Sequence, residues 1–218
     1  MLLNKFMRYA SHHQLDDKIK IAVVGAGATG VEMSAEMHHA VDQLRGFGYK
    51  IDSSLLEITL IEADDRILPK VEKAEISASV AKELTAIGVK VMTSTRINQV
   101  TEEGLYTSEG EFIPSDMVIW STGVKAPDFL KEIGGLESNH INQVMVNQNM
   151  QTTRDPAIFS IGDCAACPQE DGSWVPPRGQ SARQMALMTA DNIKLLLAGK
   201  PASNNYVYKD LGALVNLS

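Results

Sequence analysis

The stretch Lys20–Gly30, with the sequence Lys-Ile-Ala-Val-Val-Gly-Ala-Gly-Ala-Thr-Gly, joins a short apolar run to the pattern Gly-x-Gly-x-x-Gly. The apolar run predicts a buried strand, and a helical pattern begins directly after the last glycine. A second predicted strand, Ile58–Ile61, ends on Glu62. A glycine pattern between a strand and a helix, with an acidic residue closing the next strand, indicates a dinucleotide-binding site.

Each residue of the loop has a physical role in such a site. Gly25 allows a tight turn out of the strand, Gly27 allows a pyrophosphate to approach the backbone, and Gly30 allows close helix–sheet packing. The N–H groups at the helix start, those of Ala28 and Thr29 included, are free to bind phosphates and carry a partial positive charge. The alternative is a glycine turn that only packs a helix on a strand.

Glu62 indicates which dinucleotide is bound. Its carboxylate would accept hydrogen bonds from the adenosine ribose hydroxyls and would repel a 2′-phosphate, so NAD(H) is favoured over NADP(H). Ala63 and Arg66 belong to the same candidate cofactor-binding segment, and the arginine leaves NADP(H) open. Glu62 lies farther from the glycines than the usual ~20 residues, because the first predicted helix is long and a polar segment follows it.

The composition is that of a globular protein with a hydrophobic core. The chain has 218 residues, enough for one large or two small domains, and 44% of them are hydrophobic. The net charge of −7 argues against a nucleic-acid partner, and no apolar run approaches the ~18–20 residues of a membrane span. The N-terminus is too short and polar for a signal peptide, and two cysteines favour a reducing, cytosolic setting.

The pattern after Glu62 continues an alternating α/β fold. A helix is predicted over Glu72–Ile87, with Gly88 as its C-cap and an apolar face formed by Ile76, Val80, Leu84 and Ile87. A strand follows at 89–92, so the order β-α-β-α-β predicts a parallel sheet. Three short runs separated by turn residues predict an antiparallel meander, and Met117–Trp120 is the last parallel strand.

A second region begins near residue 134. A short strand is expected at Val144–Val146, a buried strand at Ile158–Ile161 and a helix from about Gln180 to Leu197. The tail from Tyr206 to Val215 has strand character.

Five segments in this order resemble those of flavoproteins with two dinucleotide-binding domains and, more closely, of bacterial type II NADH dehydrogenases, in the pyridine nucleotide-disulfide oxidoreductase superfamily. The resemblance covers nearly the whole chain. It implies an α/β fold, with a Rossmann-like three-layer NAD-binding domain, an antiparallel meander and an incomplete FAD-binding domain. The segments are the glycine loop (22–32), a ribose-side segment (62–69), a nicotinamide-side turn (120–127), a flavin motif (161–165) and a quinone-side helix start (176–184).

The resemblance implies hydride transfer from NADH to FAD and then to a membrane quinone in respiration. It assigns Thr122 and Gly123 to the nicotinamide side, and Gly162 and Asp163 to the flavin. It assigns Glu32, as the candidate catalytic residue, to the nicotinamide–flavin junction. From the residues alone, Glu32 is a carboxylate favoured near a helix N-terminus, and Asp163 is a helix N-cap.

Gln180 and Gln184 lie four residues apart, so they share a helix face, which the resemblance assigns to the quinone. The alternative is a polar, solvent-facing helix start. Cys164 and Cys167 form a Cys-x-x-Cys pattern, for which a structural role is favoured over a redox pair, and no metal site is predicted. Two other functions stay open: a flavin-dependent disulfide or ferredoxin reductase, and a non-catalytic NAD(H)-binding module.

The same resemblance indicates a fragment, because the family opens with another βαβ unit whose own glycine loop binds FAD. Residues 1–16 are then a connecting helix from the FAD domain, 17–134 the NADH-binding domain and 135–218 a truncated part of the FAD domain. We expect this chain to be soluble, to lack FAD and to self-associate through exposed apolar surface. The full-length enzyme is expected at the cytoplasmic face of the bacterial inner membrane, with peripheral membrane contact through a missing C-terminal region.

Overall fold

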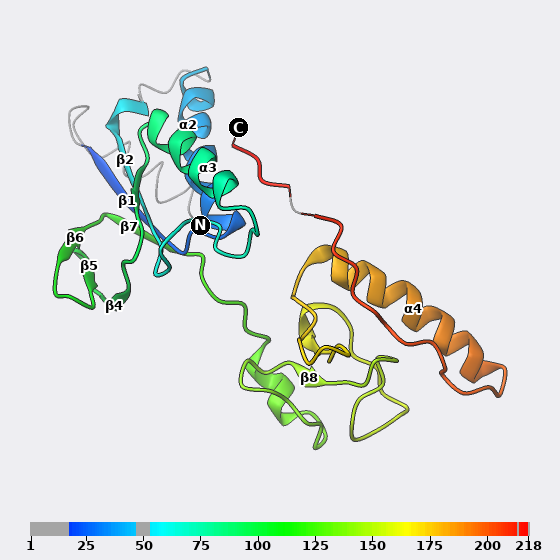
Figure 1. Cartoon of the computed structure of the whole chain (residues 1–218). Coiled ribbons are helices and arrows are strands. Elements are labelled where there is room, and N and C mark those ends of the chain that lie inside the picture. Colours follow the sequence, from blue (N-terminus) through cyan, green and yellow to red (C-terminus); the bar gives the residue numbers. More distant parts are fainter. Residues whose placement is uncertain (1–17, 47–52, 213, 218) are drawn as a thin grey trace. The chain divides into compact units, whose positions relative to one another are not determined.

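The computed structural model describes residues 18–46, 53–212 and 214–217 (Figure 1). The helix expected over residues 1–16 lies outside these residues. The chain divides into two compact units, of which the first is Met1–Thr122 with Leu214–Ser218 and the second is Gly123–Ala213. The domain boundary expected from the sequence, between residues 134 and 135, divides the chain differently and stays a prediction.

The first unit is built on a parallel sheet with the strand order β3-β2-β1-β7 (Figure 1). Val24 pairs with Ile61 on one side and with Trp120 on the other, so three strands end together at one edge. The predicted parallel sheet is therefore confirmed. A 3-10 turn, η1 (Ser53–Leu55), precedes β2, and the strands are β1 (Ile19–Val24), β2 (Leu56–Ile61), β3 (Lys90–Met92) and β7 (Met117–Trp120).

Two helices cover one face of this sheet, and the antiparallel meander covers the other. Ile21 and Val23 belong to the core beneath the helices, whereas Ala22 and Val24 belong to the core beneath the meander. The two-residue period of a strand thus supplies two separate cores, and the three-layer fold is confirmed. The helices are α2 (Ala28–Gly46) and α3 (Ala74–Ala86), and the meander is β4 (Ile97–Val100), β5 (Gly104–Thr107) and β6 (Phe112–Pro114).

Helix α3 confirms the predicted helix but buries a narrower face than expected. Leu84 is fully buried, whereas Ile76 and Ile87 are 45% and 42% exposed. Ser77 is buried in their place. The buried face of the helix therefore runs along Ser77 and Leu84, and Ile76 and Ile87 lie outside it. Gly88 follows the helix with φ +95° and donates to the Thr85 carbonyl, as expected of a C-cap glycine.

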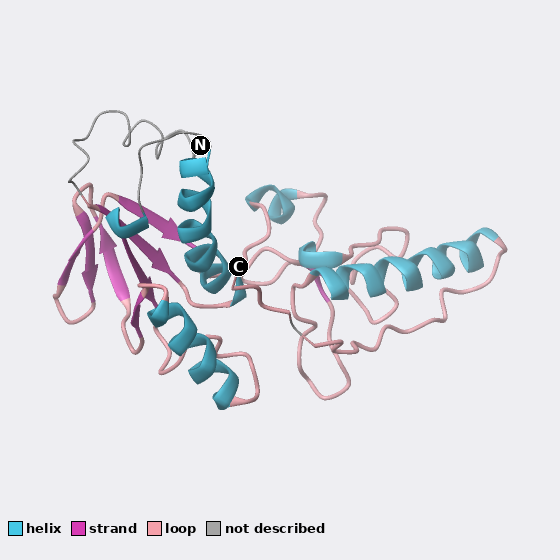
Figure 2. Ribbon diagram, turned by 90° about the horizontal axis from the view of Figure 1, so that it is seen from above, coloured by secondary structure: helices cyan, strands magenta, loops and turns pink. Residues whose placement is uncertain are grey.

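The second unit contains little sheet and one long helix (Figure 2). Its core gathers buried side chains from distant segments, among them Met150, Met185 and Tyr206. No helix among the described residues combines the length and apolarity that a bilayer crossing needs. The elements are η2 (Asp128–Glu132), β8 (Val144–Met145), η3 (Gly162–Cys164), β9 (Ala165–Ala166) and α4 (Gly179–Leu197), with β8 and β9 parallel.

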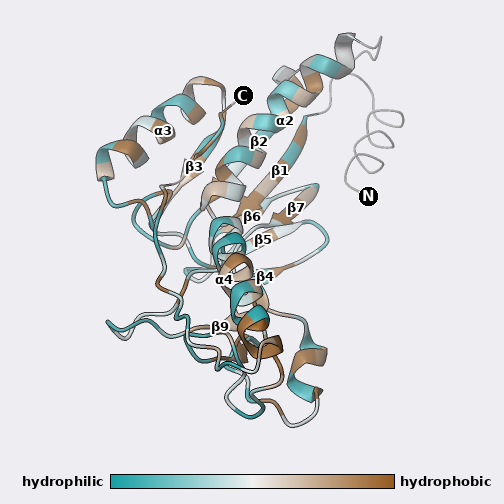
Figure 3. Ribbon diagram, turned by 90° about the vertical axis from the view of Figure 1, so that its right-hand side faces the viewer, coloured by the Kyte–Doolittle hydropathy of each residue, from teal (hydrophilic) through white to brown (hydrophobic). Residues whose placement is uncertain are grey.

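The prediction of a buried strand at Ile158–Ile161 is wrong. Phe159 forms a single isolated bridge with Gln151, and both Ile158 and Ile161 are 39% exposed. Within the described residues no neighbouring strand extends this bridge into a ladder, so the apolar side chains stay partly in solvent. Helix α4 likewise exposes apolar residues such as Leu197, at 85%, among its hydrophilic ones (Figure 3). This exposure agrees with the apolar surface expected for this region.

The tail also differs from its predicted strand, because residues 202–212, which we call the strap, run extended along α4 without pairing in a sheet (Figure 1). Side-chain carboxamides bind the strap backbone instead. Asn192 exchanges two hydrogen bonds with the backbone of Asn204, at 2.9 and 3.0 Å, and Gln169 accepts one from the Tyr208 N–H at 2.8 Å. These side chains satisfy the backbone groups that a sheet partner would otherwise satisfy.

Candidate dinucleotide-binding site

The glycine loop connects the end of β1 to the start of α2 at the carboxyl edge of the sheet. Gly25 has φ +102°, and a Cβ there would lie 2.8 Å from the Cβ of Thr122. A Cβ on Gly30 would lie 1.9 Å from the Gly25 carbonyl oxygen, whereas one on Gly27 would meet nothing within 4 Å. Two of the glycines are therefore required by close packing, and Gly27 leaves open space above the loop.

The open side of the loop carries backbone donors. Gly27, Ala28 and Thr29 are exposed, and α2 begins at Ala28. The first N–H groups of a helix have no partner within the helix, and they point toward its positive end. The first turn of α2 holds no acidic residue, so no carboxylate of that turn competes for these donors. This surface has the chemistry of an anion site.

Glu62 contacts the glycine loop directly. Its Oε2 accepts a hydrogen bond from the Ala26 N–H at 2.7 Å, and its Oε1 accepts from the N–H groups of Ala63 and Asp64 at 2.8 and 3.2 Å. A carboxylate offers about four acceptor positions, so about one stays available to a further donor. The long crossover between the glycines and the acid has thus not separated them in space.

Arg66 and Leu68 lie in the loop that follows Glu62. The Arg66 Nη2 donates to the carbonyls of Pro69 and Val71 at 3.1 and 2.8 Å, while Nη1 is buried without a hydrogen-bond partner among the described residues. Leu68 has φ +49° and donates its N–H to the Ala26 carbonyl at 2.7 Å. The guanidinium therefore faces its own loop.

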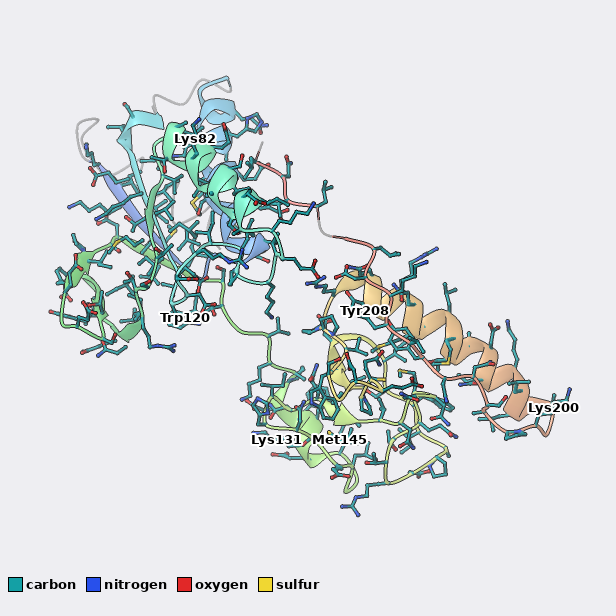
Figure 4. The ribbon with its side chains drawn as sticks, in the orientation of Figure 1. Lys82, Trp120, Lys131, Met145, Lys200 and Tyr208 are labelled. Carbon is teal, nitrogen blue, oxygen red and sulfur yellow. The ribbon has the colours of Figure 1, made fainter. Side chains whose placement is uncertain are left out.

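The end of β7 closes another side of the site. The Ser121 hydroxyl donates toward the carbonyls of Gly25 and Val24, at 2.7 and 3.0 Å, and Thr122 is exposed beside Gly25. Trp120, labelled in Figure 4, ends the strand, and Gly123 follows with φ +77°. Sequence reasoning did not single out Ser121, although a small polar residue directly after a buried strand is the signal that could have found it.

Glu32 lies half-buried one turn into α2. Its Oε1 accepts a hydrogen bond from the Asn216 N–H at 3.1 Å, and Val215 and Leu217 pack against the core of the first unit. The carboxylate thus lies near the positive end of the helix. Its expected place at the nicotinamide–flavin junction stays a prediction.

In the second unit, Gly162 and Asp163 form part of a 3-10 turn rather than a strand end. Gly162 has φ +70°, and a Cβ there would lie 3.3 Å from the Cβ of Ala182 in α4. The alternative of Asp163 as an N-cap is wrong, because Ile161 occupies that position. The Asp163 side chain is exposed, and it makes no hydrogen bond with the described part of the chain.

Gln180 and Gln184 share a face of α4, as predicted, and that face binds the strap rather than solvent. Gln180 donates to the Gly212 carbonyl at 3.1 Å and accepts from the Leu211 N–H at 2.9 Å. Gln184 donates to the Lys209 carbonyl at 3.0 Å. The alternative of a solvent-facing helix start is therefore wrong for these two side chains, while their assignment to a quinone stays a prediction.

The two cysteines are not bonded to each other. Cys167 is fully buried, and burial raises the pKa of its thiol to about 11, which suppresses the nucleophilic thiolate. Cys164 is half-buried. Across the described ranges, no three His, Cys, Asp or Glu side chains are grouped in a way that could hold a metal ion.

A strand, an open glycine loop and a helix N-terminus, with an acidic side chain bonded to the loop, define a dinucleotide-binding α/β protein. Comparison with known families gives the particular one. Residues 4–191 match the pyridine nucleotide-disulphide oxidoreductase family, and the chain belongs to it.

Among curated relatives, the type II NADH:quinone oxidoreductase of Haemophilus influenzae is 43% identical over the whole chain, which covers 52% of that relative. The enzyme of the same name from Staphylococcus saprophyticus is 31% identical over 98% of the chain and 53% of the relative. The chain thus spans about half the length of the curated relatives it matches.

Solved structures share the fold at lower identity. The structure of NDH2 from Plasmodium falciparum in complex with NADH has a TM-score of 0.77 and 17% identity, over 91% of this chain and 56% of that one. A ferredoxin reductase from Rhodopseudomonas palustris has a TM-score of 0.69 and 21% identity, over 94% of this chain and 45% of that one.

Proposed function

We propose that this chain binds NADH across the glycine loop and Glu62. The observation that carries the proposal is the hydrogen bond between Glu62 and the Ala26 N–H. It holds an acidic acceptor beside a loop whose exposed N–H groups could bind a phosphate. The pyrophosphate would bind the N–H groups at the start of α2, above Gly27. The free acceptor position of Glu62 would bind one ribose hydroxyl, and its charge would repel the 2′-phosphate of NADPH.

We further propose that the chain is part of a type II NADH:quinone oxidoreductase, which transfers hydride from NADH to FAD and then reduces a membrane quinone. The 43% identical relative bears that name. The exposed carboxylate of Asp163, beside the turn at Gly162, fits a hydrogen-bonding role toward FAD, which supplies a two-electron acceptor when it is bound.

The remaining site residues have proposed roles of their own. Thr122 and Gly123 would border the nicotinamide, and Glu32 would tune the charge beside it. Gln180 and Gln184 would lie on the quinone side, although both carboxamides bind the strap in this structure. A quinone could therefore contact these two side chains only after their hydrogen bonds to the strap are broken.

The setting of the protein is also a proposal. The whole enzyme would lie at the cytoplasmic face of a bacterial inner membrane, with peripheral membrane contact. This chain alone would retain no FAD, because its sequence holds one glycine-rich loop of the required pattern. Its exposed apolar side chains, such as Leu197, would favour self-association. Visible flavin absorption and the mass of the purified chain in solution test these two statements.

Two other functions compete with this proposal. A flavin-dependent disulfide reductase would need a reactive thiol, and the high pKa of the buried Cys167 opposes that role. A ferredoxin reductase would reduce a protein rather than a quinone, so assays with both acceptors separate these two enzymes. A non-catalytic NAD(H)-binding module would bind NADH as well as the proposed enzyme does. The complete protein would then transfer no electrons from NADH when FAD and a soluble quinone are supplied.

Titration of nicotinamide fluorescence tests the binding proposal. The chain should bind NADH at least about tenfold more tightly than NADPH, which corresponds to about 1.4 kcal/mol. The variant Glu62→Gln should lose most of that preference, whereas Glu109→Gln, in an exposed turn of the meander, should keep it. Equal affinity of the unaltered chain for both dinucleotides would refute the role of Glu62.

A further inference from the structure

The central residue of the glycine loop is held on both of its backbone groups by the segment that follows β2. The Ala26 N–H donates to Glu62 at 2.7 Å, and the Ala26 carbonyl accepts from the Leu68 N–H at 2.7 Å. Ala26 is also fully buried, in the same core as Leu68. The shape of the phosphate-binding turn therefore depends on where Leu68 is held.

Leu68 adopts a conformation that leucine rarely adopts. Its φ is +49°, in the left-handed region, and its side chain is only 3% exposed. The surrounding structure must stabilise such a residue, because its isolated backbone prefers other regions. One stabilising contact is the hydrogen bond from the Val71 N–H to the Leu68 carbonyl at 2.9 Å.

The other stabilising contacts come from Arg66. A single nitrogen, Nη2, donates to the carbonyls of Pro69 and Val71, so the guanidinium ties together the chain on both sides of Leu68. Its Nη1 is buried without a partner among the described residues. The positive charge of Arg66 is thus directed at loop carbonyls, where a 2′-phosphate does not compete for it.

We propose that Arg66 is a positioning residue for NADH binding and not a ligand for a 2′-phosphate: it holds Leu68 in place, and Leu68 in turn holds Ala26 of the glycine loop. This inference rests on the proposed binding of NADH at that loop. It assigns to Arg66 no part in the choice between NADH and NADPH, whereas the position of this arginine in the sequence suggests a contact with the 2′-phosphate of NADPH.

Hydrogen exchange of the Leu68 amide, together with the binding of NADH and NADPH, tests the proposal in the 218-residue chain. In Arg66→Ala the Leu68 amide should exchange at least about tenfold faster, while amides of β1 such as that of Val23 keep their protection. Binding of both dinucleotides should weaken by about tenfold, with their ratio unchanged. Arg66→Lys should restore part of both, since an ammonium group can also donate to two carbonyls. Arg96→Ala, at an exposed arginine of the same unit, is the matched control.

The unaltered chain provides a second test that does not depend on the folding of a variant. If Arg66 faces only its own loop, adenosine 5′-phosphate should bind more tightly than adenosine 2′,5′-bisphosphate. Tighter binding of the bisphosphate, a protected Leu68 amide in Arg66→Ala, or a loss confined to NADPH would each overturn the proposal. Failure of the unaltered chain to bind NADH would instead refute the proposed function. The exchange rate of the Leu68 amide in Arg66→Ala would then still test whether Arg66 holds Leu68 in place.

Discussion

The change Gly30→Ala should destabilise the first unit because the helix and the loop are already in contact there. The added Cβ would lie 1.9 Å from the Gly25 carbonyl oxygen and 2.7 Å from the Ser121 Oγ. A relaxed carbon–oxygen contact is about 3.3 Å, so α2 or the loop would have to move by about 1.4 Å. Overpacking of this kind costs about 1–3 kcal/mol, and the lost Ser121 hydrogen bond adds about 1. The better helix propensity of alanine offsets about 1, which leaves a net loss of about 1–3 kcal/mol.

The same change three residues earlier should act on binding instead of folding. A Cβ on Gly27 meets nothing within 4 Å, and the φ of Gly27 lies outside the left-handed region. The free energy of unfolding should therefore stay within about 0.5 kcal/mol of the parent value. The methyl group would occupy the space proposed for the pyrophosphate, so the Kd for NADH should rise more than about tenfold, or 1.4 kcal/mol.

Urea unfolding followed by circular dichroism, and NADH fluorescence titration, measure the two effects on the same samples. We expect Gly30→Ala to change mainly the free energy of unfolding and Gly27→Ala to change mainly the affinity for NADH. Similar destabilisation by both variants would show that the loop packing is described wrongly. Full NADH affinity in Gly27→Ala would show that the dinucleotide does not cross the loop at this residue.

Three further outcomes follow from the second unit. Cys164 should react with a thiol reagent at pH 8 long before Cys167, since a pKa of about 11 leaves roughly one thiolate in a thousand, as mass spectrometry after brief alkylation can check. Gln184→Ala should cost about 1–2 kcal/mol and speed proteolysis of the strap, whereas Arg183→Ala, at the exposed neighbouring position, should not. Hydrogen bonds, first from the backbone N–H of Gly212, hold the pKa of Asp210 below its usual value. Asp210 thus stabilises the strap above about pH 4, and this contribution should disappear as the pH falls through the lowered pKa, with faster strap proteolysis below pH 4 as the readout.

The parts of the fold that the sequence predicted well are those with a strong local period and a local stop signal. The strand before Gly25, the helix that begins in the glycine loop and the glycine at position 88 each combine an apolar pattern with a residue that breaks it. The contact between Glu62 and the loop was also predictable, because parallel strands bring their carboxyl ends to one edge. These features depend little on which distant segment packs against them.

The wrong predictions share a different cause, which is that each depended on a partner the local sequence does not specify. Ile158–Ile161 has the composition of a strand but has one isolated bridge in place of a ladder. The strap has strand character too, yet carboxamides such as Gln184 bind its backbone. Ile76 follows the helical period of α3, but it is 45% exposed, and Ser77 is buried beside it. A periodic pattern predicts which side chains are buried, but it does not specify the segment that packs against them.

The hydrogen bond between Glu62 and Ala26 has a consequence for how coenzyme choice could change over evolution. One carboxylate would both discriminate between dinucleotides and satisfy a backbone donor in a buried turn. Mutation to a small neutral residue, the simplest route toward accepting a 2′-phosphate, would leave the Ala26 N–H without an acceptor, at a cost of about 1–3 kcal/mol. A lineage that switched coenzyme by this route would need a second, compensating substitution in the same loop. The proposed preference for NADH would thus be tied to a hydrogen bond that also shapes the glycine loop.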